Sequence, residues 1–224
     1  MLKEYRTVYE GGEGRIEEKK SKFIATVYPI ENEVAEGAME EVLALIEKTK
    51  KRYWDARHNC FAYCIGLEQE ILRCSDDGEP AGTAGKPMLD VLTGMGIHNV
   101  LVVVTRYFGG TLLGTGGLVR AYSGAVKEGL ANSVVITKKF GVKMDVLTDY
   151  TGLGKIQYIL GKRGLKVLDS VYTDAVEVRV LIPVDEVDCV LAEITEGTNG
   201  QARYERGEEC YFAEVDGEMI VFGE

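Results

Sequence analysis

The sequence has few of the features on which several common protein classes depend. Its five cysteines are an odd number at irregular spacing, which excludes a framework of paired disulfides and favours reduced thiols. No apolar run approaches the roughly 18–20 residues that a membrane helix needs. The charged start Met1–Arg6 lacks the apolar core of a signal peptide. We therefore expect a cytoplasmic protein that does not interact with a membrane.

The chain also lacks the basic excess of a protein that wraps nucleic acid over its whole surface. Its formal net charge is −10, while its hydrophobic content of 46% is ordinary for a globular protein. Residues 1–137 contain 16 Lys and Arg against 19 Asp and Glu, whereas residues 138–224 contain 10 against 17. A polyanion would therefore approach the N-terminal part first.

Hydrophobic patterns divide residues 1–137 into strands and helices. An amphipathic helix is predicted after Asn32, and its apolar face consists of Met39, Val42, Leu43 and Ile46. The apolar run Val100–Val104 predicts a buried strand. The other predicted elements are a strand at His58–Ile65, a short strand at Glu70–Cys74, a helix at Pro87–Leu92, and a helix from Thr115, its expected N-cap, to Leu130.

Residues 138–224 show the element order β-α-β-β-α-β, which is the ferredoxin-like arrangement. The first strand alternates at Val142, Met144 and Val146, and the first helix has the apolar face Leu153, Ile156 and Leu160. Lys138-Lys139 marks the predicted boundary. We therefore predict an α+β protein with one domain at 1–137 and a second at 138–224.

Two glycine-rich segments, Ser75–Pro87 and Thr105–Arg120, are the most informative part of the chain. Glycine is costly unless a turn needs a positive φ or a backbone must approach something closely. Because Lys86, Arg106 and Arg120 lie among these glycines, the segments predict a groove in which backbone N–H groups and cations bind an anion. The glycines assigned to this groove are Gly82, Gly85, Gly109, Gly110, Gly116 and Gly117.

Neither segment matches a common nucleotide-binding loop. A P-loop with its lysine at Lys86 would need glycine at position 80 and Ser or Thr at position 87, where the chain has Pro80 and Pro87. A dinucleotide fingerprint that starts at Gly114 would need Gly or Ala at position 119, where the chain has Val119. We therefore expect no cofactor.

A zinc site is also not expected, although His58, Cys60, Cys64 and Cys74 are close in sequence. On one strand, Cys60 and Cys64 would lie about 13 Å apart at ~3.3 Å per residue. Two thiolates of one zinc ion must each lie within ~2.3 Å of it. We interpret these cysteines as small buried side chains on the core face of a strand.

The acidic residues Asp76, Asp77 and Glu79 permit two interpretations. Beside Lys86 they could serve as metal ligands or as acid and base, which would make the protein an enzyme for a small phosphorylated or carboxylated substrate. They could instead pair with Arg106 and Arg120 as a structural ion-pair network. An arginine pair in this place is equally suited to a planar anion such as carboxylate or phosphate.

The stretch Lys48–Arg57 interleaves positive charge with Tyr53 and Trp54. Phosphate contacts together with aromatic stacking would suit RNA. A solvated helix end followed by a core aromatic residue explains the same pattern. The cations assigned to the RNA interpretation are Lys51, Arg52 and Arg57.

These segments resemble the signatures of the IMPACT/YigZ family, whose N-terminal domain is of the UPF0029 type. The resemblance rests on Asp76–Pro87, Val104–Gly110 and Leu113–Tyr122, and it extends to Ser21–Ala25 and Ala56–Cys60. It implies an N-terminal two-layer α/β domain like that of a small-subunit ribosomal protein and of GHMP kinases. It also implies a ferredoxin-like C-terminal domain similar to the last domain of elongation factor G.

The resemblance implies a role in translation. Eukaryotic relatives regulate translation during amino-acid starvation by competing for the activator of an initiation-factor kinase. We therefore expect a non-enzymatic regulatory protein whose partner is the ribosome, RNA or a translation-associated protein. In this interpretation Lys86, Arg106 and Arg120 contact the anionic partner, and the enzyme described above is the alternative.

Overall fold

The computed structural model describes residues 2–32 and 35–223, and the chain forms two units. Tyr5–Thr137 is the N-terminal domain, and Lys138–Glu224 with the segment Met1–Glu4 is the C-terminal domain. Strand β8 (Val134–Thr148) contains the boundary, so Lys138 and Lys139 lie within a strand. Each domain has an apolar core of its own.

The N-terminal domain is built on a five-stranded antiparallel sheet in the order β2-β3-β7-β4-β5. Outside this sheet, β1 (Glu4–Glu10) pairs in parallel with the two-residue β6 (Ile97–His98). The predicted strand at His58–Ile65 is confirmed, and the strand predicted at Val100–Val104 continues further. The strands of the sheet are β2 (Glu13–Glu18), β3 (Ser21–Pro29), β4 (His58–Ile65), β5 (Ile71–Ser75) and β7 (Val100–Tyr107).

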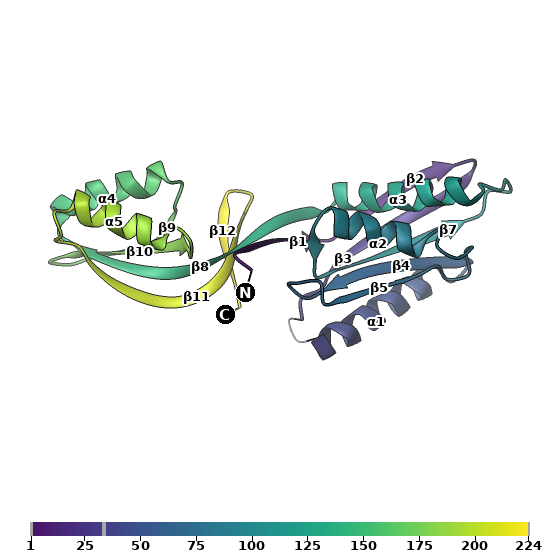
Figure 1. Cartoon of the computed structure of the whole chain (residues 1–224), viewed down its shortest axis with the longest axis horizontal. Coiled ribbons are helices and arrows are strands. Elements are labelled where there is room, and N and C mark those ends of the chain that lie inside the picture. Colours follow the sequence, from purple (N-terminus) through teal and green to yellow (C-terminus); the bar gives the residue numbers. More distant parts are fainter. Residues whose placement is uncertain (1, 33–34, 224) are drawn as a thin grey trace. The chain divides into compact units, whose positions relative to one another are not determined.

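Helices cover both faces of this sheet (Figure 1). Along the central strand β7, Val100, Val102 and Val104 belong to the core under two helices, whereas Leu101 and Val103 belong to the core under the third. Helices α2 and α3 pack on the face of Val100, Val102 and Val104, and α1 packs on the opposite face. The resemblance implied two layers, one sheet and one layer of helices, so α1 forms a third layer. The helices are α1 (Ala35–Arg52), α2 (Gly85–Gly94) and α3 (Thr115–Ala131).

The buried face of α1 differs from the predicted face. Val42 and Ile46 are buried as expected, but Leu43 is 58% exposed. The buried positions are spaced by three or four residues, which leaves Leu43 outside the stripe. Positions 33–34 lie outside the described residues, so the predicted helix start after Asn32 is described only from Ala35. The buried positions of α1 are Ala38, Val42, Ile46 and Thr49.

The C-terminal domain has the predicted ferredoxin-like topology. Its strand order is β9-β10-β8-β11 with every neighbouring pair antiparallel, and β12 pairs with β11 beyond them. Two helices cover one face, and their Ile156, Leu160 and Ile194 are fully buried there. The elements are α4 (Tyr150–Lys162), β9 (Val167–Tyr172), β10 (Val176–Pro183), α5 (Val187–Gly197), β11 (Arg203–Val215) and β12 (Glu218–Phe222).

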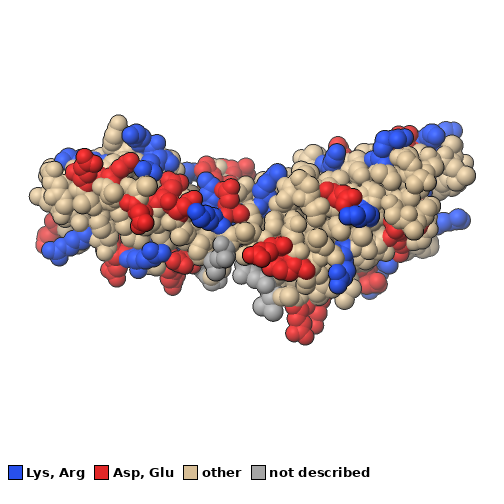
Figure 2. Space-filling model, in the orientation of Figure 1, with Lys and Arg blue, Asp and Glu red and all other residues tan. Residues whose placement is uncertain are grey.

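The surface is mixed in charge. On the face that Figure 2 shows, Lys and Arg side chains are interspersed with Asp and Glu side chains over both domains. Within the described parts of the chain, no helix combines the length and the apolar character needed to cross a membrane.

The position of α1 predicts different costs for two substitutions on that helix. Ile46→Ala should lower the free energy of unfolding by about 2–5 kcal/mol, because Ile46 is 4% exposed and its removal leaves a cavity. Leu43→Ala should change it by less than about 0.5 kcal/mol, because this side chain lies in solvent. Urea unfolding followed by circular dichroism measures both. Equal losses for the two variants would contradict the position of the helix.

Candidate functional site

Both glycine segments lie at one end of the sheet in the N-terminal domain. Strands β5 and β7 end there, at Ser75 and Tyr107, and β3 and β4 begin there. The pairing of Lys22 with Tyr107 and of His58 with Arg106 fixes these ends side by side. Helices α2 and α3 start after the loops that leave β5 and β7. We call this region, formed by residues 75–84 and 108–117, the loop end.

The loop end is organised around a buried ion pair. Arg106 Nη1 donates to Glu79 Oε1 at 2.6 Å, and the two side chains are only 6% and 3% exposed. The hydroxyl of Tyr122 on α3 donates to the same oxygen at 2.8 Å. The ring of Phe23 lies 5.4 Å from the guanidinium carbon. Arg106 is therefore held inside the domain by a carboxylate of the acidic segment and is not presented to an anion in solvent.

A thiol continues this buried network. The single S–H of Cys60 has two acceptors within reach, the carbonyl of Asp76 at 3.0 Å and the hydroxyl of Tyr122 at 3.3 Å from Sγ. Burial raises the pKa of the Cys60 thiol to about 12, and burial also raises the pKa of the Tyr122 hydroxyl. Both groups are therefore neutral at pH 7, and Cys60 is not available as a thiolate nucleophile.

The other cysteines of the rejected zinc set do not gather around Cys60. Cys64 is buried in the same core, whereas Cys74 is exposed. In the parts of the chain that the structure describes, no three His, Cys, Asp or Glu side chains lie close enough together to hold a metal ion.

Asp76 closes the first glycine segment. Its Oδ1 accepts from the N–H groups of Ala84 and Gly85 at 2.9 and 2.8 Å, and its Oδ2 accepts from Gly82 at 2.8 Å. Burial alone would raise the pKa of Asp76, but these three N–H donors outweigh burial and hold the pKa below its usual range. The carboxylate caps the start of α2, where the N-cap residue Ala84 has no side chain that could do so.

Asp77 has a second structural role. Its Oδ2 accepts from the backbone N–H of Asn59 at 2.7 Å, and its Oδ1 lies 3.6 Å from Lys50 Nζ at the end of α1. Its carbonyl oxygen lies 2.9 Å from His58 Nδ1. All three acidic residues, Asp76, Asp77 and Glu79, are therefore engaged by groups of the domain itself.

Backbone geometry explains four of the six glycines assigned to the groove. Gly82 and Gly110 have φ values of +74° and +87°, which side chains disfavour. A Cβ on Gly109 would overlap the backbone of Lys20, and one on Gly85 would lie 2.8 Å from the backbone of Ser75. These four glycines serve turns and close packing.

Gly116 and Gly117 have neither a positive φ nor a close backbone neighbour, although a Cβ on Gly117 would lie 3.1 Å from the Cβ of Leu113. A Cβ on Gly116 would meet only the Nη1 atom of Arg120, at 3.6 Å. Gly114, with φ +70°, is the N-cap of α3 in place of the predicted Thr115. The first turn of α3 is therefore open to solvent on one side, with the Arg120 guanidinium above it.

The three predicted cations differ in their surroundings. Lys86 is exposed and pairs with Asp90 at 2.6 Å, one turn further along α2. Arg106 is buried, as described above, and Arg120 is exposed near Gly116. Because the register of β7 turns Arg106 toward Phe23 and the core, the structure supports the ion-pair interpretation of Arg106. Anion binding by Lys86 and Arg120 stays a prediction.

The cations near the end of α1 also differ in availability. Arg52 pairs with Glu13 on β2, and its guanidinium lies 5.0 Å from the Tyr53 ring. Lys51 and Arg57 are exposed, and Trp54 is 83% exposed rather than in the core.

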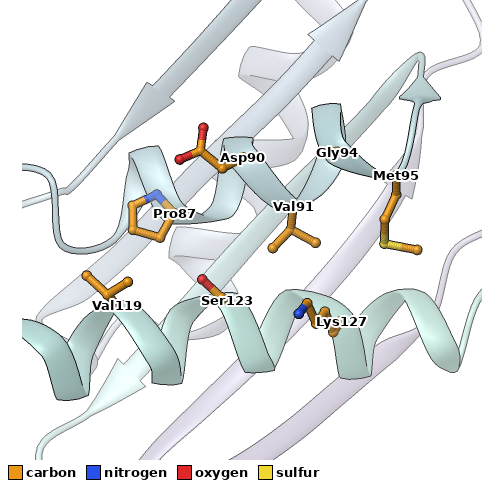
Figure 3. Close-up of a pocket in the computed structure, with 8 residues that line it drawn as sticks. All are labelled: Pro87, Asp90, Val91, Gly94, Met95, Val119, Ser123 and Lys127. Atoms are coloured by element: carbon orange, nitrogen blue, oxygen red, sulfur yellow. The ribbon is translucent and has the colours of Figure 1, made fainter.

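Two hollows of the domain were not predicted from the sequence. One, of about 440 Å³, lies between α2 and α3, with Val91 and Met95 on one side and Val119 and Lys127 on the other (Figure 3). The second, of about 650 Å³, is called the β2–β3 groove here. The residues that line the β2–β3 groove are Arg15, Ile16, Glu17, Lys20, Lys22, Phe23, Ile24, Tyr107 and Phe108.

Comparisons with known proteins identify relatives along almost the whole chain. Residues 19–130 match the Impact N-terminal domain, and residues 146–201 match a domain of unknown function, DUF1949. The chain is 41% identical over 211 residues to IMPACT family member YvyE of Bacillus subtilis, with 94% of each chain covered. It is 38% identical over 185 residues to IMPACT family member YigZ of Escherichia coli, with 80% of this chain and 88% of that protein covered.

More distant similarity reaches animal proteins and a solved structure. Protein IMPACT of Mus musculus is 32% identical over 145 residues, which are 63% of this chain and 42% of the mouse protein. A crystal structure of a hypothetical protein has a TM-score of 0.57 and 34% identity, and the match covers 91% of this chain and 97% of that one.

The capping role of Asp76 predicts a pH-dependent loss of stability on its removal. Asp76→Ala should lower the free energy of unfolding at pH 7 by about 1–3 kcal/mol, because three N–H groups lose their acceptor. The pKa of Asp76 is lower in the folded than in the unfolded state, so this stabilisation is present above the usual pKa of 3.8 and is lost as pH falls through the folded value. Urea unfolding from pH 7 into the acid range should show the two proteins converge. A difference that does not change with pH would refute this role.

The buried ion pair predicts non-additive effects of its two partners. Arg106→Met should cost about 3–5 kcal/mol, because it leaves the Glu79 carboxylate buried and without its cation. Adding Glu79→Gln should recover part of that loss, since the amide removes the charge and still accepts from Tyr122. Chemical unfolding of the two single variants and the double variant forms the cycle. If the double variant loses the sum of both single losses, the pair does not couple as described.

Proposed function

This chain belongs to the IMPACT family, and from that membership we propose that it is a translation-associated regulatory protein that binds the ribosome through the loop end of its N-terminal domain. The link to translation is supported by the similarity to animal proteins named IMPACT. The family resemblance described in the sequence analysis implies that eukaryotic members regulate translation. RNA and translation-associated proteins are the other partners consistent with this role. The specific surface is our inference from the geometry of the loop end.

The observation that carries this proposal is the exposed start of α3. The first intrahelical bond is donated by Leu118 to Gly114, so the N–H groups before it are free to face a ligand. Gly116 leaves this turn without a side chain, and Arg120 supplies a positive charge beside it. N–H groups, helix dipole and guanidinium together favour a phosphate or carboxylate of the partner. Lys51 and Arg57 are exposed cations of the same domain and would extend the contact.

The enzymatic alternative has no supporting observation at this site. Asp76 is occupied by three backbone donors, Asp77 by Asn59 and Lys50, and Glu79 by Arg106 and Tyr122. These contacts give each carboxylate a structural role, so we do not propose it as an acid, base or metal ligand.

Ribosome co-sedimentation across a salt series tests the proposal. The wild-type protein should bind at low salt and lose affinity steeply as salt rises, because phosphate contacts release counterions. Arg120→Glu should weaken binding about tenfold or more, since it removes one charge-assisted contact and adds repulsion. Lys127→Glu is the matched control: it makes the same charge change two turns further along α3 and should change binding less than about twofold.

Two outcomes would overturn the proposal. The first is an absence of co-sedimentation at low salt, and the second is equal weakening by Arg120→Glu and Lys127→Glu. Circular dichroism of both variants shows that a loss of binding is not a loss of folding. Nuclease treatment of the bound fraction separates RNA from protein partners, because binding to a ribosomal protein survives digestion and binding to RNA does not.

A further inference from the structure

The β2–β3 groove lies beside the turn between β2 and β3 and the end of β7. Helix α1 packs on one face of this sheet mainly against β4 and β7, and it also contacts β3 through Tyr28 and β2 through Glu13. The strand register places Arg15 beside Ile24, and Glu17 beside Lys22, which in turn faces Tyr107. These five side chains therefore share the face of the sheet on which α1 packs.

The cations of the groove are available to a ligand. Lys20 and Lys22 are exposed, and the side-chain amino group of neither has a hydrogen-bond or ion-pair partner among the described residues. Arg15 is also exposed, and its Nη2 lies 3.4 Å from Glu13 Oε2, which is a long contact for an ion pair. The groove contains one carboxylate, Glu17, so its cations outnumber its acids by three to one. This charge balance favours an anionic ligand that also carries a hydrogen-bond donor for the Glu17 carboxylate.

The aromatic side of the groove is held in place. Phe108 is 52% exposed, and the guanidinium of the buried Arg106 lies 5.7 Å from the centre of its ring. The hydroxyl of Tyr107 donates to Asp55 at 2.7 Å. Because these contacts already hold the rings of Tyr107 and Phe108, little side-chain entropy is lost when a ligand binds. An exposed aromatic ring is a platform on which a nucleic-acid base stacks.

We propose that the β2–β3 groove binds single-stranded RNA, with a base stacked on Phe108 and backbone phosphates held by Lys20 and Lys22. The arrangement combines a basic track with an exposed aromatic ring, which is the usual design of single-strand binding sites. Glu17 can accept a hydrogen bond from the exocyclic amino group of a base. A phosphate group has no such donor, so Glu17 favours a ligand that carries a base. A volume of about 650 Å³ is in the range of pockets that enclose a small organic group.

This site goes beyond the proposed function, because it requires neither the ribosome nor the start of α3. The residues that line the β2–β3 groove come from β2, β3, the turn between them and the end of β7, and none of them belongs to α3. Binding of a short RNA by the purified protein and co-sedimentation with ribosomes can therefore succeed or fail independently.

Fluorescence anisotropy with a labelled single-stranded RNA of about 12 nucleotides tests the proposal. Phe108→Ala should weaken binding by about 5- to 150-fold, the range for loss of one base–aromatic stack. Leu112→Ala is the matched control, because this 82% exposed side chain lies in the same loop and has no ring. It should leave the affinity unchanged. Unchanged thermal unfolding of both variants shows that the comparison concerns binding.

The lysines give a second, independent measurement. The double variant Lys20→Ala/Lys22→Ala should reduce the slope of log affinity against log salt by about 1.4, at ~0.7 for each phosphate contact with a single strand. Lys127→Ala on α3 should leave the slope unchanged. The proposal is overturned if Phe108→Ala or the lysine variant binds like the wild type. Equal affinity for a duplex of the same sequence, for a mononucleotide, or for an acidic peptide would also overturn it.

Discussion

One buried ion pair holds the loop end of the N-terminal domain together. Arg106 is the last but one residue of the central strand, Glu79 lies in the loop that leads to α2, and Tyr122 on α3 donates to the same carboxylate oxygen that Arg106 binds. Removing one partner would leave the other charge buried and unpaired, and this costs far more free energy than the intact pair contributes to stability. The strand, the loop and the helix therefore hold one another in position. Gly85 and Gly109 allow the surrounding backbones to approach closely enough for this to happen.

The same network separates the residues that maintain the fold from those that can meet a partner. The acidic motif looks catalytic in sequence, yet Asp76 and Asp77 accept hydrogen bonds from the backbone of their own domain. The side chains that we propose for recognition lie outside the network, at Arg120 beside the open turn of α3 and in the β2–β3 groove. Phe108 connects the two groups of residues, because it packs on the buried Arg106 and is also half exposed.

The local elements and the ferredoxin-like domain could be predicted from the sequence, because each depends on periodicity within one segment. The position of α1 could not be predicted. The run Val100–Val104 is apolar at every position, so its pattern does not indicate on which face of the sheet a given helix packs. The interpretation of Arg106 stayed open for a similar reason: only the register of β7 against β3 and β4 turns it toward Glu79. The β2–β3 groove escaped prediction because Arg15 and Tyr107 come from segments that are far apart in the chain.

The central strand has a consequence for synthesis of the protein on the ribosome. Strand β7 pairs with β3 on one side and β4 on the other, so hairpins β2–β3 and β4–β5 have no common partner until residues 100–107 have emerged. Contacts of such long sequence separation make folding slow. The nascent chain therefore exposes two hairpin edges and the apolar faces beside them. It needs protection from aggregation during that interval, and the interval ends when Val100–Tyr107 closes the sheet.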